Sequence, residues 1–467
     1  MSKSIATLKD LADMGYTSPM AKDCLAGIVR KKILKGEELF PDIFGLDMEK
    51  RRFVEVLITG KGGLLTGEYG VAKTDLAKHV LSLLNEYYAE EQIFYVEKCP
   101  VQEDPMILMH SILNQNQNSG DAKGEPCPIC KHLIREASGD LSQIGVRRLD
   151  QLVEGTGFAR VQGGGDVLPE EIIGTYNLLK LAQIGDPFDP RVFEPGKIGQ
   201  SSRGLLFVDE IGKLPETAQH ALIQAAQESI VTPAKSRETF PVDFLLVATT
   251  NPIDEEYICG AVRDRLISLK IPMVGLEDEI RIVQKEVEKL EPRVYVPKVF
   301  LKLAVEVVRA LRGDERLEIG PRTSINAGLI GRSSALLEGL SVAGFCNVKE
   351  GIYTAILGKA LYEDKAGVEK RIDELFPEIS SYIEKNIKEI DISKIVRYCH
   401  DEWGNDKEWD STNIKKLING KKAPDNFVKL FRWTLKNESI DKDSIYEVIS
   451  DYLLAYDRGC EISGKTN

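Results

Sequence analysis

The chain lacks the features of a membrane protein and of a disulfide-rich secreted protein. No window of its 467 residues approaches the roughly 18 consecutive apolar residues that a membrane-spanning helix needs. Eight cysteines are too few for a disulfide framework in a chain of this length. The start, MSKSIATLKDLADMG, lacks the continuous apolar core of a secretory signal. We therefore expect a cytoplasmic protein with reduced thiols and no membrane partner.

The chain also lacks an excess of basic charge. Its 61 Lys and Arg residues oppose 73 Asp and Glu residues, which gives a net charge of −12 at pH 7. A protein that coats duplex nucleic acid normally has the opposite sign, so nucleic acid is not an expected partner. With 43% hydrophobic and 29% charged residues, the composition is typical of globular proteins. At about 100 to 200 residues per domain, the length predicts two to four domains.

Short apolar runs alternate with helical patterns between residues 53 and 273. The runs are GLLTG, IFYVEK, RGLLFVDEI, FLLVATTNP and LISLKIP. Such alternation predicts an α/β fold in which helices flank a parallel sheet. After Pro272 the apolar residues recur at a spacing of 3.6, which predicts a smaller helical domain.

These changes in pattern divide the chain into four predicted segments. Residues 1–40 form an N-terminal helical segment, and residues 41–275 form the α/β core with a cysteine-containing insertion at 99–150. Residues 276–375 form the smaller helical domain. Residues 376–467 form a C-terminal helical extension that is richer in Lys, Asp and Asn, and its role is open.

A phosphate-binding loop is predicted where an apolar strand runs through a tight turn into a helix. The loop residues are Gly67, Glu68, Tyr69, Gly70, Val71, Ala72, Lys73 and Thr74. Backbone N–H groups converge at a helix N-terminus, where the helix dipole also favours an anion. We expect Lys73 to reach the β- and γ-phosphates of a nucleotide and the Thr74 hydroxyl to coordinate Mg²⁺. Ala72 departs from the usual glycine, and its methyl group requires a negative or slightly strained φ. A loop with this spacing by chance is the alternative.

An acidic pair ends the strand in RGLLFVDEIGKL. A buried parallel strand delivers its last residues to the edge of the sheet where ligands bind. We expect Asp209 to hold Mg²⁺, mostly through water, and Glu210 to polarise the attacking water. The alternative is a solvated acidic pair that closes a strand.

Three further polar residues are candidates for the same chemistry. Asn251 lies near the end of the run FLLVATTNP, where its amide either orients the water or touches the γ-phosphate. The alternative is an asparagine that terminates the strand before proline. Arg263 and Arg265 flank Asp264 in AVRDRLISLKIP. An arginine can neutralise transition-state charge on the nucleotide of a neighbouring subunit. A surface arginine that pairs with Asp264 is the alternative.

Together, GEYGVAKT, LLFVDEI, VATTNP, VRDRL and GPRTS occur in the order of an AAA+ ATPase, and this resemblance covers residues 40–365. GVAKT is similar to the MoxR family, in which alanine before the lysine is usual. EEIIGTYNLLKL followed by FEPGKIGQSSRGLLFVDEIGKL resembles the ATPase subunit of magnesium chelatase. CPVQEDPMILMHSIL and CPICKHLIREASGDLSQIGVRRL resemble the AAA+ region of PrkA-type serine protein kinases. The stretch past Asp364 resembles no family that we can place.

The resemblance implies a parallel-sheet P-loop AAA+ core with a helical lid, and it gives each residue a role. Lys73 and Thr74 would bind ATP and Mg²⁺, and Asp209 and Glu210 would serve metal and water. Asn251 would be the first sensor. The implied arginine finger is Arg265, the implied second sensor is Arg322 of GPRTS, and the less favoured residues for these two roles are Arg263 and Arg332.

The resemblance also implies an assembly and a task. A finger from a neighbouring subunit requires a ring, which we expect to be a homo-hexamer. ATP hydrolysis would then remodel or activate a client protein, and the MoxR similarity suggests a client with a von Willebrand A domain. The alternatives are a PrkA-like serine protein kinase, a metal-chelatase motor, a nucleic-acid motor, and a nucleotide-binding scaffold without turnover. The intact Glu210 argues against the scaffold.

Cys127-Pro-Ile-Cys130 has the spacing of half a zinc knuckle. Together with Cys99 and either His132 or His110, the pair would provide four ligands for Zn²⁺. Because a structural zinc site usually has two clear ligand pairs and the second is missing, free thiols are the alternative.

Overall fold

A computed structural model of the chain divides it into two compact units, Met1–Pro272 and Met273–Asn467, each described here by itself. The structure describes residues 5–458 apart from 114–124, 188, 190, 291–293, 315–316, 318, 360–364, 388–389, 404–408, 421–422, 439 and 441–443. The four segments predicted from the sequence stay predictions. Among the described residues, we find no helix that is both long enough and apolar enough to cross a membrane.

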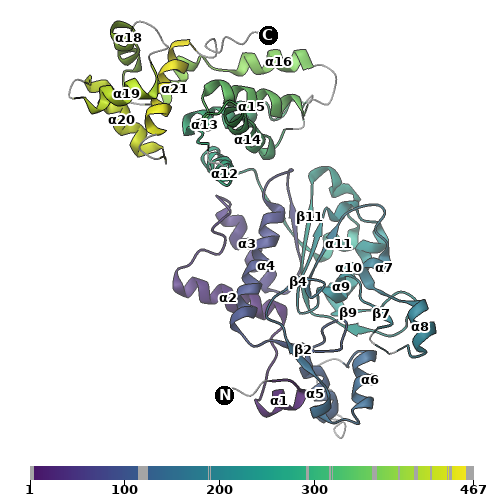
Figure 1. Cartoon of the computed structure of the whole chain (residues 1–467). Helices are drawn as coiled ribbons and strands as arrows, with labels where there is room; N and C mark the ends of the chain where they lie inside the picture. The colour runs from purple at the N-terminus through teal and green to yellow at the C-terminus, as the bar shows by residue number, and fades with distance from the viewer. Residues whose placement is uncertain are drawn as a thin grey trace. The chain divides into compact units, whose positions relative to one another are not determined.

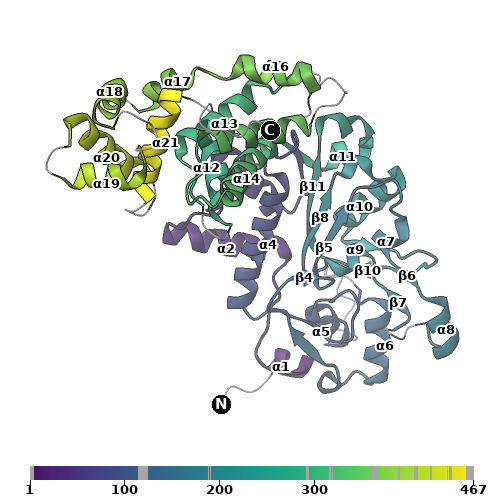
Figure 2. The same ribbon diagram turned by 45° about the horizontal axis from the view of Figure 1, so that its top comes forward.

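The first unit is built on a six-stranded sheet with the order β12-β1-β11-β8-β5-β4. Figure 2 labels β11, β8, β5 and β4 of this sheet. All ladders of the sheet are parallel. Its strands are β1 (Gly63–Thr66), β4 (Val153–Glu154), β5 (Gly157–Gln162), β8 (Gly204–Asp209), β11 (Phe244–Thr250) and β12 (Ile267–Lys270). β1 and nearly all of β8 and β11 are buried, as expected for strands that helices cover on both faces. The predicted parallel sheet is confirmed.

The run IFYVEK was expected to belong to this sheet, and that expectation is wrong. It forms β2 (Phe94–Val96), which pairs antiparallel with β3 (Val146–Arg148) in a separate two-stranded sheet. The place beside β8 belongs to β5, whose sequence GFARVQ alternates buried and exposed residues and contains no long apolar run. A short apolar run shows that a strand exists but not which sheet it joins.

Alternate residues of the central strands point into two different cores. Leu205 and Phe207 of β8 pack with α2 (Ala21–Lys35), α3 (Asp47–Ile58) and α4 (Lys73–Glu90). The neighbouring Leu206 and Val208 pack with α10 (Glu216–Glu228) and α11 (Gly260–Arg265). This period of two follows from the pleat of a strand. Figure 1 shows the resulting three layers, with α2, α3 and α4 on one face of the sheet and α10 and α11 on the other.

The remaining elements of the first unit lie outside the central sheet and the five helices named above. They are α1 (Leu8–Asp13), α5 (Pro105–Leu113), α6 (Pro128–Glu136), α7 (Pro169–Ile173), β6 (Thr175–Tyr176), α8 (Leu178–Ile184), β7 (Phe193–Glu194), α9 (Lys197–Gln200), β9 (Ile230–Val231), β10 (Phe240–Pro241) and the 3₁₀ turns Leu141–Gln143, Ile211–Lys213 and Pro252–Tyr257. β6 pairs with β7 and β9 pairs with β10, each as an antiparallel pair.

In the described residues of the second unit, the regular elements are all helices. They are α12 (Leu276–Glu288), α13 (Lys298–Ala310), α14 (Pro321–Leu337), α15 (Phe345–Leu357), α16 (Lys365–Leu375), α17 (Ile379–Asn386), α18 (Ile392–Trp403), α19 (Ser411–Asn419), α20 (Asp425–Asn437) and α21 (Ser444–Arg458). The domain predicted after Pro272 is therefore helical, as expected.

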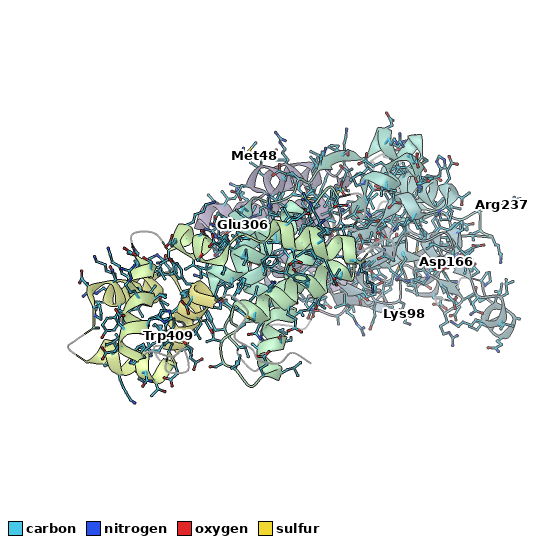
Figure 3. All side chains as sticks on the ribbon, turned by 90° about the horizontal axis from the view of Figure 1, so that it is seen from above. Met48, Lys98, Asp166, Arg237, Glu306 and Trp409 are labelled. Carbon is cyan, nitrogen blue, oxygen red and sulfur yellow. The ribbon has the colours of Figure 1, made fainter. Side chains whose placement is uncertain are left out.

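One hydrophobic core joins the early and late helices of the second unit. Phe300 of α13 lies 5.9 Å from Phe345 of α15 and 5.4 Å from Tyr452 of α21, measured between ring centroids. The hydroxyl of Tyr382 donates to Glu306 at 2.7 Å and so links α17 to α13. Figure 3 marks Glu306 and also the fully buried Trp409, which lies among the C-terminal helices.

A buried carboxylate adds a polar link to this core. Glu438 is only 4% exposed. It accepts hydrogen bonds from the hydroxyls of Tyr295 and Tyr452 and from the backbone N–H of Lys298. A buried acceptor that loses a donor keeps the cost of its desolvation.

We expect Tyr452→Phe to lower the free energy of unfolding by about 1 to 3 kcal/mol, because it removes one donor from Glu438. Tyr456→Phe is the matched control on the same helix, since its bond to Glu384 is exposed, and it should change the value by less than about 0.5 kcal/mol. Urea unfolding of the full chain, followed by circular dichroism, measures both. Equal effects of the two substitutions would contradict the role given to Glu438.

Candidate nucleotide site

Three adjacent strands deliver polar residues to one edge of the central sheet. β11 lies between β1 and β8. Because the strands are parallel, the residues that follow each of them meet at the same edge. Lys73 follows β1 after a short loop, Asn251 follows β11, Asp209 ends β8, and Glu210 comes directly after it. The structure thus brings four of the predicted site residues together.

The loop between β1 and α4 has the geometry of an anion cradle. Gly67 allows close contact, because a Cβ atom at this position would lie 2.5 Å from the carbonyl oxygen of Ile271. Gly70 has a φ of 82°, in the region that favours glycine. The loop leads into the N-terminus of the 18-residue α4, where backbone N–H groups have no partner within the helix.

Ala72 adopts the left-handed conformation, with φ at 63° and ψ at 16°. The sequence analysis required either a negative φ or a slightly strained backbone at Ala72. Because φ is positive, the backbone is strained. The left-handed region costs an L-residue other than glycine roughly 1 to 2 kcal/mol. The loop thus stores strain at the residue that precedes Lys73.

Lys73 is the central cation of the site, and its side chain is 8% exposed. Its ammonium group donates to the backbone carbonyls of Gly67 and Glu68, the latter at 2.8 Å, and to Oδ1 of Asn251 at 2.9 Å. A buried ammonium needs such acceptors. The same three donors are available for phosphate oxygens when a nucleotide occupies the loop. Thr74 is half-buried in the first turn of α4.

Asn251 connects the lysine to the acidic pair. Its amide nitrogen donates to Oε1 of Glu210 at 3.2 Å while its oxygen accepts from Lys73. Thr249 holds the pair in place: its hydroxyl donates to Oδ1 of Asp209 at 2.6 Å and accepts from the backbone N–H of Glu210 at 3.0 Å. Asn251 also directly follows β11 and precedes Pro252, so its position fits both expectations, and its role towards water or phosphate stays a prediction.

Two residues of β5 belong to the site and were missed by the sequence analysis. Arg160 forms an ion pair with Oδ2 of Asp209 at 2.6 Å, and Gln162 donates to Oε2 of Glu210 at 3.0 Å. They share one face because they are two residues apart on a strand, and the register sets Gln162 opposite Asp209. The alternation of apolar and polar residues in GFARVQ was the sequence signal that could have identified this strand.

Lys213 completes the environment of Glu210. Its ammonium lies 3.0 Å from Oε1 of the carboxylate. Both oxygens of Glu210 therefore have partners, since Asn251 and Lys213 contact one and Gln162 contacts the other.

The predicted arginines lie in different settings. Arg265 is exposed at the end of α11, and Arg263 is also exposed but donates to the carbonyl of Glu255 at 2.5 Å. Arg322 and Arg332 both belong to α14 of the second unit. Arg322 is exposed, whereas Arg332 is buried and donates to the carbonyl of Leu290 at 3.1 Å. The roles of Arg265 as finger and Arg322 as second sensor stay predictions.

The cysteine pair lies in a second cluster, distinct from the phosphate loop. Sulfur atoms of Cys99, Cys127 and Cys130 and a carboxylate oxygen of Glu103 all lie within 4.8 Å of one another, and all four residues are buried. Burial, together with the neighbouring Cys99, raises the pKa of Glu103 to about 8. Burial also raises the pKa values of the Cys127 and Cys130 thiols.

The histidine expected in this cluster is not part of it. Nε2 of His132 lies 3.3 Å from Glu136 and 3.5 Å from Asp186. His110, the other histidine considered, lies on α5 and is not in the group either. Glu103 takes the fourth place. The sequence signal was its position four residues after Cys99, which a search for Cys and His alone overlooks.

The phosphate loop, the acidic strand end and the parallel sheet define the class of the protein: it is an AAA+ P-loop ATPase. A family model described as the PrkA AAA domain matches residues 8–305, which is more than half of the chain. The chain therefore belongs to the PrkA AAA domain family, and the resemblance seen in its sequence is confirmed.

The chain is also similar to curated relatives of two other kinds. Chaperone MoxR1 of Mycobacterium tuberculosis is 25% identical over 246 residues, which cover 44% of this chain and 61% of the relative. A magnesium-chelatase subunit ChlI homolog of Methanocaldococcus jannaschii is 25% identical over 280 residues, 58% of this chain and 64% of the relative. The chain thus spans about three fifths of the length of these relatives.

A solved structure with a similar chain is the RuvB Holliday junction branch migration motor of Thermotoga maritima. It is 14% identical, and the match covers 68% of this chain and 72% of that one with a TM-score of 0.36.

We expect Ala72→Gly to raise the free energy of unfolding by up to about 1 kcal/mol, because glycine adopts the left-handed conformation without strain. Ala77→Gly is the control of opposite sign: Ala77 is buried within α4, and glycine there should lower stability by about 1 kcal/mol. Thermal unfolding without nucleotide compares the two. A destabilising Ala72→Gly would show that the backbone at this position is not strained.

Proposed function

We propose that this AAA+ protein hydrolyses ATP with the residues at the edge of its central sheet, and that it does so in an oligomeric ring that remodels a client protein. The observation that carries the proposal is the continuous hydrogen-bonded path from Lys73 through Asn251 to Glu210. A cation for the γ-phosphate and a base for water are the two parts that phosphoanhydride hydrolysis needs.

Binding of ATP follows from the loop and Lys73. N–H groups at the start of α4 face the phosphates, and the helix dipole favours their charge. Lys73 exchanges the carbonyls of Gly67 and Glu68 for phosphate oxygens. These carbonyls now hold the ammonium group in the loop, so the lysine is in position before the substrate arrives.

The residues around Asp209 fit Mg²⁺. The carboxylate of Asp209 and the hydroxyl of Thr74 are oxygen ligands of the kind that this ion prefers. When bound, Mg²⁺ would neutralise charge on the β- and γ-phosphates. Thr249 orients one oxygen of Asp209, and Arg160 pairs with the other. Arg160 therefore has to release this oxygen of Asp209 when the oxygen binds the metal ion.

Glu210 is the proposed base. A carboxylate activates water by accepting its proton, which requires a free lone pair directed at that water. Gln162 holds one oxygen, and Asn251 and Lys213 hold the other. When Lys73 leaves the carbonyls of Gly67 and Glu68 for phosphate oxygens, its bond to Asn251 changes with them. A nucleotide in the loop therefore alters the position of the side chain that contacts the base.

The proposed ring and client follow from one exposed arginine and from the relatives of the chain. Exposed Arg265 is free to serve a neighbouring subunit's nucleotide. The relative named chaperone MoxR1 supports a client protein, and by the MoxR similarity we propose a client with a von Willebrand A domain and a homo-hexameric ring. A protein kinase is the second candidate, because the matching family model carries the PrkA name.

We expect Lys73→Ala to weaken ATP binding by about 100-fold, since it removes charged hydrogen bonds to phosphate. Glu210→Gln should bind ATP as the parent does and hydrolyse it about 10² to 10⁴ times more slowly. Calorimetry measures binding, and release of labelled γ-phosphate measures turnover. Equal turnover by Glu210→Gln and the parent would refute the assignment of the base, and label on protein instead of free phosphate would favour the kinase.

A mixing experiment tests the finger. Arg265→Ala keeps its own phosphate loop but lacks the finger, and Lys73→Ala keeps the finger but lacks the lysine that binds phosphate. Each variant alone should therefore be inactive. A mixture of the two should regain a measurable fraction of parental ATPase activity if Arg265 completes a neighbour's site. Arg263→Ala is the matched control and should keep near-parental activity. Absence of recovery in mixtures that co-assemble on a sizing column would exclude a role between subunits.

A further inference from the structure

The first unit contains a buried set of three thiols and one carboxylate that the proposed ATPase chemistry does not use. Cys99 and Glu103 lie in the turn after β2, and Cys127 and Cys130 lie at the start of α6. Figure 1 shows β2, α5 and α6 side by side in the first unit. The three cysteines belong to the hydrophobic core that also contains residues of α10 and α11, and Glu103 adjoins it through its bond with Cys127.

The distances in this set match a tetrahedral metal site. Zn–S bonds of about 2.3 Å place two sulfur ligands about 3.8 Å apart, and a shorter Zn–O bond brings sulfur and oxygen slightly closer. The sulfurs of Cys99 and Cys127 are 3.8 Å apart. The sulfur of Cys99 lies 3.9 Å from Oε2 of Glu103. Every pair of ligand atoms is within 4.8 Å, so a small shift of side chains closes the tetrahedron.

Backbone groups hold the ligands in this arrangement. The N–H of Cys127 donates to both carboxylate oxygens of Glu103, at 3.0 and 3.1 Å. The N–H of Cys130 donates to the sulfur of Cys127 at 3.3 Å. Cys127 is the N-cap of α6, so its sulfur faces the positive end of the helix dipole. Such outer partners orient ligands and stabilise their anionic forms.

The turn that carries the other two ligands is also fixed. The N–H of Cys99 donates to the carbonyl of Val96 at 3.0 Å, and the N–H of Val96 donates to the carbonyl of Glu103 at 3.0 Å. Gln102 within the turn has a φ of 49° and donates to the carbonyl of Gly155 at 3.2 Å. The turn thus presents Cys99 and Glu103 from a backbone that neighbouring strands hold.

A disulfide does not account for the cluster. The three cysteines are free, and 3.8 Å between sulfurs is well beyond the roughly 2.05 Å of a disulfide bond. Burying four ionised acidic groups together carries a desolvation cost that a bound dication reduces. Three sulfurs and one oxygen favour Zn²⁺ over Mg²⁺, which prefers six oxygen ligands.

We propose that Cys99, Glu103, Cys127 and Cys130 bind one structural Zn²⁺ ion. Four protein ligands close the coordination sphere, which is typical of a structural and not a catalytic site. On binding, the thiols and the carboxyl group release their protons to solvent, and the ion holds three thiolates and one carboxylate. The ion links the turn after β2 to the start of α6 through its four ligands.

The test measures metal in the full-length protein, purified without chelator from zinc-containing medium. Mass spectrometry for metals should find about one zinc per chain. Cys127→Ala should reduce the zinc content at least about tenfold. Cys259→Ala, a buried thiol outside the cluster, is the matched control and should keep it. Absence of stoichiometric zinc in the parent, or a Cys99–Cys127 disulfide in the freshly purified protein, would overturn the proposal.

A second variant distinguishes loss of a ligand from loss of the fold. Glu103→Cys converts the site to four thiolates, which zinc accepts, so it should keep one zinc per chain. Replacement of zinc by Co²⁺ should give a thiolate-to-metal absorption band in the parent that increases by about one third in Glu103→Cys, since the number of thiolates rises from three to four. An unchanged band in a folded Glu103→Cys protein would exclude Glu103 from the ligands.

Discussion

One side-chain amide connects the two halves of the candidate nucleotide site. Asn251 accepts a hydrogen bond from Lys73 with its oxygen and donates one to Glu210 with its nitrogen. A lysine can only donate and a carboxylate can only accept, so an amide is suited to join them. Its position depends on the strand order, because β11 lies between β1 and β8, the strands that precede the other two residues. The rest of the site is arranged around this contact.

Hydrophobic burial supplies the rigidity that this polar edge needs. β1 is buried throughout, and β11 is buried apart from its first residue. Their alternate side chains enter two separate cores, so the strands cannot shift by one residue without exchanging those cores. The polar residues therefore project from a scaffold whose register is determined by packing. The same scaffold tolerates a strained backbone at Ala72.

The parts predictable from the sequence were those with a strong local pattern. The buried strands read as apolar runs, and the loop before Lys73 and the pair Asp209-Glu210 follow such runs directly. Arg160 and Gln162 were not predictable in the same way, because β5 alternates and becomes a neighbour of β8 only through tertiary pairing. Glu103 was missed because its relation to Cys127 depends on folding across 24 residues of chain. Side-chain partners from distant strands are fixed by topology and not by spacing.

The close approach of Gly67 to Ile271 has a mechanical consequence. A Cβ atom at Gly67 would meet the Ile271 carbonyl at 2.5 Å, and the N–H of Ile271 donates to the carbonyl of Thr66 at 2.7 Å. Ile271 is the penultimate residue of the first unit. The strand that ends in the phosphate loop is thus clamped to the peptide from which the helical unit departs. Displacement of that loop therefore acts on a peptide that lies five residues before α12, the first helix of the second unit.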